Sequence, residues 1–92
     1  MDERKKMRNR DKKIFQLALG RVIRKRRTIK GDTMEEVAGN IGIDAKHLNE
    51  IELGNKEAGS YILTLLQIEL NINSDEYLQE FQQMKAERIE ND

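Results

Sequence analysis

The feature that most constrains this chain is the segment from Thr33 to Gly54, TMEEVAGNIGIDAKHLNEIELG, which carries the start signals of two short helices. Thr33 and Glu36 fit a capping box, in which each side chain satisfies an exposed backbone N–H of the first helical turn. Asp44 is a second N-cap residue. Gly42, just before it, suits a turn with positive φ. The segment therefore predicts two helices joined by a tight turn, the second ending at Gly54.

The apolar residues of this segment assign an inward and an outward side to each helix. The inward residues are Val37, Ala38, Ile41, Ile43, Leu48 and Ile51. The outward positions of the second helix are short or polar, and they are Ala45, Lys46, His47, Asn49 and Glu50. Two short helices with a glycine turn, the second of which exposes a polar face, are typical of the helix-turn-helix pattern.

The rest of the chain predicts three more helices and no strand, so the expected fold class is all-α. Residues 14–27 place Phe15, Leu19, Val22 and Ile23 on one helix face, and Gly31 ends that helix. Residues 61–70 suit a buried helix through Ile62, Leu65, Leu66 and Leu70, and Asn71 and Asn73 break it around an inward Ile72. Ser74 is the expected N-cap of the last helix. The apolar residues of that helix are Tyr77, Leu78, Phe81, Met84 and Ile89.

Length and composition limit the function classes that remain. A chain of 92 residues forms one domain with a modest core. It has no cysteine, which excludes disulfides and thiolate metal sites. With a single histidine, we expect no structural zinc and no other metal or cofactor. No apolar run reaches the length of a membrane span, and the basic N-terminus lacks the apolar core of a secretory signal. We expect a cytoplasmic protein.

The formal net charge of zero conceals a strong asymmetry between the two parts of the chain. Residues 1–30 hold 13 Lys or Arg against 3 Asp or Glu, and residues 31–92 hold 4 against 14. This asymmetry indicates either a basic face for a polyanion or a solvated charged helix. The predicted organisation is a basic N-terminal arm or helix extension (1–13), a helix-turn-helix domain (14–74) and a C-terminal helix (75–92) that serves dimerisation or binds a partner.

Residues 19–78 resemble the Cro/repressor-type helix-turn-helix domain of Xre-like bacterial and phage regulators. The resemblance rests on four stretches in this order: LGRVIRKRR, TMEEVAGNIGID, LNEIELGN and LNINSDEYL. It implies a compact five-helix, lambda-repressor-like fold. It also implies a sequence-specific transcriptional regulator, a repressor, that inserts helix 45–53 into the major groove of double-stranded DNA.

The resemblance also implies roles for single residues. Base-reading positions are matched by Ala45, Lys46 and Glu50, with His47 and Asn49 beside them. Phosphate-binding positions are matched by Arg27, Thr33, Met34, Asn55, Lys56 and Ser60, where Met34 replaces the usual glutamine. Arg27 and Glu52 match an ion pair of the family.

General chemistry agrees with the base-reading assignment and leaves plainer alternatives open. Lys46 can donate to guanine O6 and N7, Glu50 can accept from cytosine N4, and Ala45 can contact a thymine methyl group. Alternatively, Glu50 pairs with Lys46 one helical turn away, His47 is a surface polar residue, and the pair of Arg27 has a structural role alone.

The expected partners are double-stranded DNA and a second copy of the chain. Tyr77, Phe81 and Met84 form an apolar stripe on the last helix, which either binds a partner or folds back over Phe15 and Leu19. The competing function is an antitoxin or co-regulator that acts through this helix. We expect no enzyme, because the sequence lacks a catalytic Ser/His/Asp or Cys/His set and a phosphate-binding glycine loop.

Overall fold

The computed structural model describes residues 3–91, and the side chains of residues 3–88. In this range the chain forms five helices and no strand, which confirms the predicted all-α fold class. The helices are α1 (Glu3–Lys30), α2 (Met34–Ile41), α3 (Ala45–Glu52), α4 (Ser60–Leu70) and α5 (Ser74–Asn91). Ile89, expected on the apolar side of the last helix, lies outside the described side chains. None of the helices within residues 3–91 has the length and apolarity to cross a membrane.

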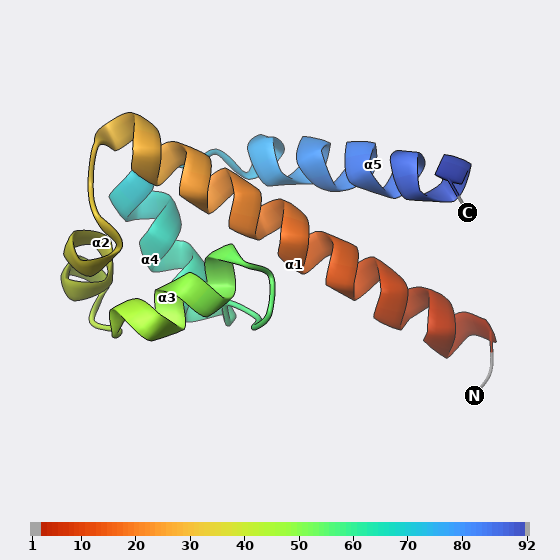
Figure 1. Ribbon diagram of the computed structural model, residues 1–92, viewed down its shortest axis with the longest axis horizontal. Helices are drawn as coiled ribbons and strands as arrows, with labels where there is room; N and C mark the ends of the chain where they lie inside the picture. Colours follow the sequence, from red (N-terminus) through yellow and green to blue (C-terminus); the bar gives the residue numbers. More distant parts are fainter. Residues whose placement is uncertain (1–2, 92) are drawn as a thin grey trace.

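Helix α1 is the longest element, and the other four helices are arranged around it (Figure 1). Its 28 residues correspond to about 42 Å, and the longest dimension of the molecule is 41 Å. The basic run Arg4–Lys13 continues this helix without a break, so the helix extension is the alternative that the structure adopts. Figure 1 shows α2, α3 and α4 gathered beside the C-terminal half of α1, while its N-terminal end extends past them.

Helix α5 runs antiparallel to α1 along much of its length (Figure 1). Three ion pairs spaced along both helices fix this alignment: Arg26–Glu76 (2.6 Å), Arg21–Glu80 (3.0 Å) and Asp11–Lys85 (3.1 Å). Beneath them, Met84 is 6 % exposed and packs with Ile14 and Ala18 of α1. The apolar contact of α5 with α1 is thus made at Ile14 and Ala18, and the charged residues before Ile14 contribute the ion pair at Asp11.

The apolar stripe predicted on the last helix packs against α1 of the same chain. Phe15 forms edge-to-face contacts with both Tyr77 (5.8 Å between ring centroids, 88° between planes) and Phe81 (5.6 Å, 80°). Together with the burial of Met84, these contacts use the stripe inside the chain. The alternative in which the stripe folds back over Phe15 is the one that the structure shows.

The main core lies where α1 meets α2, α3 and α4. It consists of Leu19, Val22, Ile23, Val37, Ala38, Leu48, Ile51, Leu66, Leu70 and Ile72. The sequence pattern predicts an inward position for every one of these residues. Phe15, Ile41, Ile43 and Ile62, also predicted inward, are partly buried at the edge of this core.

The predicted cap of α5 is displaced by one residue. Ser74 is the first residue of the helix, and the Asn73 side chain accepts a hydrogen bond from the Asp75 N–H (3.1 Å). The Asn73 N–H in turn donates to Glu76 (2.8 Å), so the two residues cap the helix reciprocally. The Ser74 hydroxyl instead bonds Gln67 and Tyr77. Asn73 and Ser74 are both suitable N-cap residues. Asn73 takes this role because the Ser74 hydroxyl is used in tertiary contacts.

Candidate nucleic-acid interface

The turn between α2 and α3 has the local geometry expected from its residues. The Glu36 N–H donates to the Thr33 hydroxyl (3.1 Å) and the Thr33 N–H to the Glu36 carboxylate (3.3 Å), which completes the capping box. Gly42 has φ of 81°, in the left-handed region that favours glycine. The Asp44 side chain then accepts from the His47 N–H (2.7 Å) and starts α3. The two helices thus form a helix-turn-helix unit.

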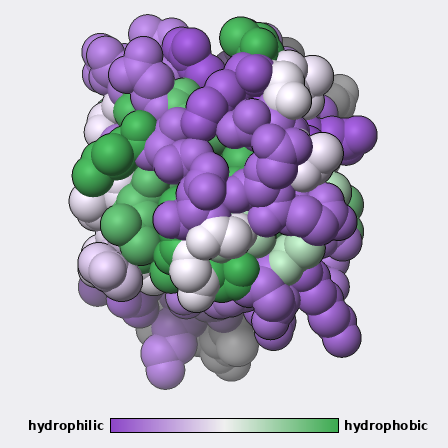
Figure 2. All heavy atoms as spheres, turned by 90° about the vertical axis from the view of Figure 1, so that its left-hand side faces the viewer, coloured by the Kyte–Doolittle hydropathy of each residue, from purple (hydrophilic) through white to green (hydrophobic). Residues whose placement is uncertain are grey.

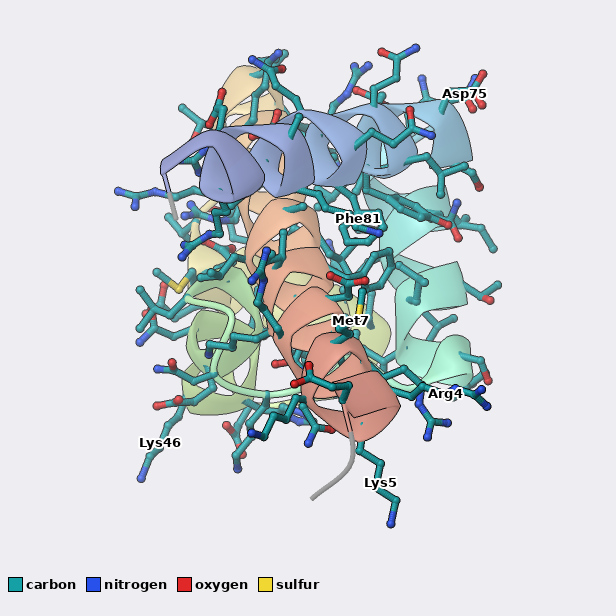
Figure 3. All side chains as sticks on the ribbon, turned by 90° about the vertical axis from the view of Figure 1, so that its right-hand side faces the viewer. Arg4, Lys5, Met7, Lys46, Asp75 and Phe81 are labelled. Carbon is teal, nitrogen blue, oxygen red and sulfur yellow. The ribbon has the colours of Figure 1, made fainter. Side chains whose placement is uncertain are left out.

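Helix α3 buries one face and exposes the other. Leu48 and Ile51 are almost completely buried, whereas Lys46 is exposed and points away from the body of the protein (Figure 3). The partly exposed residues beside it are Ala45, His47, Asn49 and Glu50. Ala45 also packs against the core, so it presents less surface than its outward assignment suggested.

Charged groups gather at an open hollow beside the exposed face of α3. The hollow has a volume of about 470 Å³ and is lined by Asp44, Lys46, His47, Glu50 and Lys56. Among residues 3–88, no ion pair joins Lys46 to Glu50, so the alternative in which they neutralise each other is not adopted. The side chains of Lys46 and Glu50 are therefore available to another molecule.

The loop after α3 is held against both α3 and α1. The N–H groups of Asn55 (2.9 Å) and Lys56 (3.3 Å) donate to the Glu50 carbonyl, which closes the end of the helix. Lys13 of α1 donates to the Gly54 carbonyl at 2.5 Å, and Lys12 pairs with Glu57 at 2.8 Å. The hydrogen bond from Lys12 lowers the pKa of Glu57.

The sequence did not indicate this use of Lys12 and Lys13, which it places in the basic arm or helix extension (1–13). Their sequence position was the available signal, because the two lysines lie next to the first apolar face of α1. Leu17, about one turn later, contacts the same loop at Gly54. Lysines at the junction of a charged run and a core helix can reach carbonyl groups of neighbouring loops. The two residues therefore orient the loop that follows the candidate recognition helix.

Arg27 and Glu52 form the predicted ion pair with two hydrogen bonds. Arg27 Nε donates to one Glu52 carboxylate oxygen (2.7 Å) and Nη2 to the other (3.0 Å), while Nη1 donates to the Asp32 carbonyl (3.1 Å). The Glu52 side chain is 2 % exposed and that of Arg27 13 % exposed. The hydrogen bond with Glu52 raises the pKa of Arg27 against the opposing effect of burial. The pair joins α1, the turn after it and the end of α3.

The second link between α1 and α3 is a close backbone approach at Gly20. A Cβ atom at this position would lie 2.7 Å from the Ile51 carbonyl oxygen and 2.8 Å from the Glu52 carbonyl carbon. Only glycine allows the two helices to lie so close together. The sequence analysis did not single out this residue, although a glycine inside a predicted helix was a usable signal.

Helix α2 is positioned by a polar cluster at the other end of the unit. The Lys30 ammonium pairs with Glu69 of α4 (2.9 Å) and with Asp32 (3.1 Å), and Asn40 of α2 donates to Glu69 (2.8 Å). The hydrogen bonds that Lys30 and Asn40 donate lower the pKa of Glu69, and those that Lys30 donates to Glu69 and Asp32 raise the pKa of Lys30. Both helices of the unit are therefore fixed to α1.

The predicted phosphate-binding residues lie around this unit, and the side chain of one of them, Met34, points inward. The exposed ones are Thr33, Asn55, Lys56 and Ser60. The Met34 side chain instead packs against the core, so only its backbone remains at the surface position. Arg27 uses three N–H groups within the protein, as described above. Among the described residues, no three His, Cys, Asp or Glu side chains gather in a way that would hold a metal ion.

Comparison with known proteins finds a similar solved structure. No protein-family model matches the sequence, and no curated protein matches it. The fold is similar to the crystal structure of the clp gene regulator ClgR from Corynebacterium glutamicum, with a TM-score of 0.72 and 28 % sequence identity. The match covers 84 % of this chain and 83 % of that chain. The chain thus has, over most of its length, the fold of a gene regulator.

Proposed function

We propose that this chain is a transcription regulator that binds double-stranded DNA and inserts α3 into the major groove. The observation that carries the proposal is the division of α3 into two faces. Leu48 and Ile51 fix one face in the core, while Lys46 and Glu50 stand on the other without an ion pair between them. The similarity to the gene regulator ClgR supports the same function.

The groups around α3 suit the two kinds of contact that DNA recognition needs. Lys46 near the helix N-terminus donates to guanine, and Glu50 accepts from cytosine N4. His47 and Asn49 lie beside them, and Ala45 contributes a methyl group at the edge of the core. Thr33, the Met34 backbone, Asn55, Lys56 and Ser60 bind phosphate oxygens and set the register of the helix. Arg27 adds its remaining N–H groups to this set.

We propose further that the regulator is an Xre-like repressor that binds a palindromic site as a homodimer. One unit of this size contacts few base pairs, and two-fold symmetry doubles the number that is read. The basic extension of α1, whose side chains at residues 3–10 are exposed, adds phosphate attraction that is independent of sequence. The proposed activity is binding and involves no catalytic step.

Selection of bound DNA from a random duplex library tests the proposal. We expect wild type to enrich one palindromic sequence, and Lys46→Ala and Glu50→Ala to relax the preference at different base pairs, each by about 1–3 kcal/mol. Lys25→Ala and Glu87→Ala are matched controls, because these residues are exposed on α1 and α5, away from the unit. If all four variants enrich the wild-type sequence equally, α3 does not read the bases.

The competing function, a partner protein that acts through the last helix, gains no support from the residues that suggested it. Tyr77, Phe81 and Met84 pack against α1 of the same chain. A partner at α5 would have to use the charged outer side of this helix.

A further inference from the structure

Helix α4 is apolar on both sides, although the structure buries only one of them. Leu66 and Leu70 face the core and are 0 % and 4 % exposed, while Tyr61 and Ile68 are 72 % and 74 % exposed. The sequence predicted a fully buried helix here, and a helix that is apolar all round is normally covered on all sides. One side of α4 therefore lacks its cover in the single chain.

The uncovered side forms a continuous stripe, which we call the outer face of α4. Tyr61, Leu65 and Ile68 follow one another at intervals of one helical turn, with the exposed Thr64 beside them. Glu69 is the single charged residue of α4, and Lys30 and Asn40 already bind it. The outer face therefore carries no charge, in a chain of which 37 % of the residues are charged.

A further apolar residue, Met7 of α1, is 62 % exposed. In Figure 3, Met7 lies on the side of α1 that faces α4, below Phe81. Figure 2 views the opposite end of the molecule, so the α4 side is on its left, and hydrophobic residues gather there. Apolar surface collected on one side in this way marks an interaction site.

We propose that a second copy of this chain covers the outer face of α4. In a two-fold symmetric contact, one surface patch meets the identical patch of the second copy. Each charged group of the patch therefore lies close to charged groups of the same patch in the other copy. A charged patch would repel itself in this arrangement, whereas the neutral outer face does not.

The position of α4 is also compatible with the function of α3. The two helices lie on opposite sides of α1 (Figure 3), so a copy seated on α4 leaves the exposed face of α3 uncovered on both chains. This inference places the homodimer contact on α4 instead of the predicted Tyr77/Phe81/Met84 stripe. Its consequence for DNA binding rests on the proposed function, but self-association can be measured without DNA.

Sedimentation equilibrium of wild type and two single variants tests the contact. We expect wild type to be dimeric at tens of micromolar, and Ile68→Glu to raise the dimer dissociation constant by tenfold or more, because it brings two carboxylates together. Ile29→Glu is the matched control: this isoleucine is 66 % exposed on α1 and should leave the dissociation constant unchanged. Tyr61→Glu is the second variant, and circular dichroism shows that each variant is folded.

A wild type that is monomeric at tens of micromolar overturns the proposal, as does a folded Ile68→Glu or Tyr61→Glu that associates like wild type. A duplex carrying one half of the selected palindrome separates this test from that of the proposed function. Ile68→Glu should bind this half-site like wild type and lose affinity for the full palindrome. If wild type dimerises through α4 but binds no DNA sequence preferentially, the proposed function fails and the contact stands.

Discussion

Replacement of Gly20 by alanine is expected to destabilise this protein, although alanine is the better helix former. Gly20 lies in α1 where the end of α3 approaches it, and an added Cβ would be 2.7 Å from the Ile51 carbonyl oxygen. The Glu52 carbonyl oxygen would be closer still, and an ordinary contact begins at 3.4 Å, so the two backbones must separate by about 1 Å at this point. The obstructing atoms belong to the backbone of a helix, and no side-chain rotation can relieve the overlap.

The expected magnitude follows from two opposing contributions. Alanine in place of glycine in a helix stabilises by about 0.5–1 kcal/mol. Overpacking a core contact costs about 1–3 kcal/mol, and a rigid backbone obstacle belongs at the upper end of this range. The net loss for Gly20→Ala is therefore about 2 kcal/mol. In a domain of this size, that corresponds to a decrease in Tm of roughly 8–16 °C.

Gly39 provides a matched control with the same chemical change. It lies inside α2, and a Cβ at this position would meet no atom within 4 Å. Gly39→Ala should therefore stabilise by about 0.5–1 kcal/mol. The assay is urea unfolding of both variants followed by circular dichroism at 222 nm (the usual helix signal). Equal effects of the two substitutions, or a stabilising Gly20→Ala, would refute the close approach of α1 and α3.

Two further predictions concern charged groups. Glu52→Gln should destabilise by about 3 kcal/mol in urea unfolding, because it leaves the largely buried Arg27 without its carboxylate; the exposed Glu87→Gln is the control, and equal unfolding midpoints would contradict a structural role for the pair. For Glu76, burial alone would raise the pKa, but the hydrogen bonds from Arg26 and the Asn73 N–H, with the charges of Arg26 and Lys25, lower it overall. The unfolded chain then binds more protons in acid, so the stability that Glu76 contributes is present above its ordinary pKa of about 4.5 and disappears as the pH falls through the lowered value. Unfolding between pH 7 and pH 3 should show a weaker pH dependence for Glu76→Gln than for wild type, and identical profiles would count against this contribution.

The features that sequence reasoning predicted well depend on residues close together in the chain. The capping box of Thr33 and Glu36, the cap at Asp44 and the positive φ of Gly42 each involve a single turn, so their residues alone determine them. The inward residues of α2 and α3 follow from helical periodicity in the same way. The helix-turn-helix unit can therefore be located from the amino-acid sequence alone.

The features that it missed depend on contacts between distant segments. The sequence left open whether Phe81 and Met84 bind a partner or fold back, because it does not show how α5 packs on α1. The close approach at Gly20 and the carbonyl contact of Lys13 likewise join residues far apart in sequence. The uncovered side of α4 had the composition of a buried helix, and its exposure became visible only in the folded chain.

The central claim, that the exposed face of α3 enters the major groove, is tested most directly by NMR of the labelled protein bound to its selected DNA duplex. The amide signals that move most should be those of residues 33–34, 44–50 and 55–60, which comprise the helix N-termini, the exposed face of α3 and the loop after it. The same titration with a duplex of scrambled sequence should move the signals of residues 45–50 much less. If the largest changes lie in α5 or on the outer face of α4, while residues 44–50 keep their free positions, α3 is not the recognition helix.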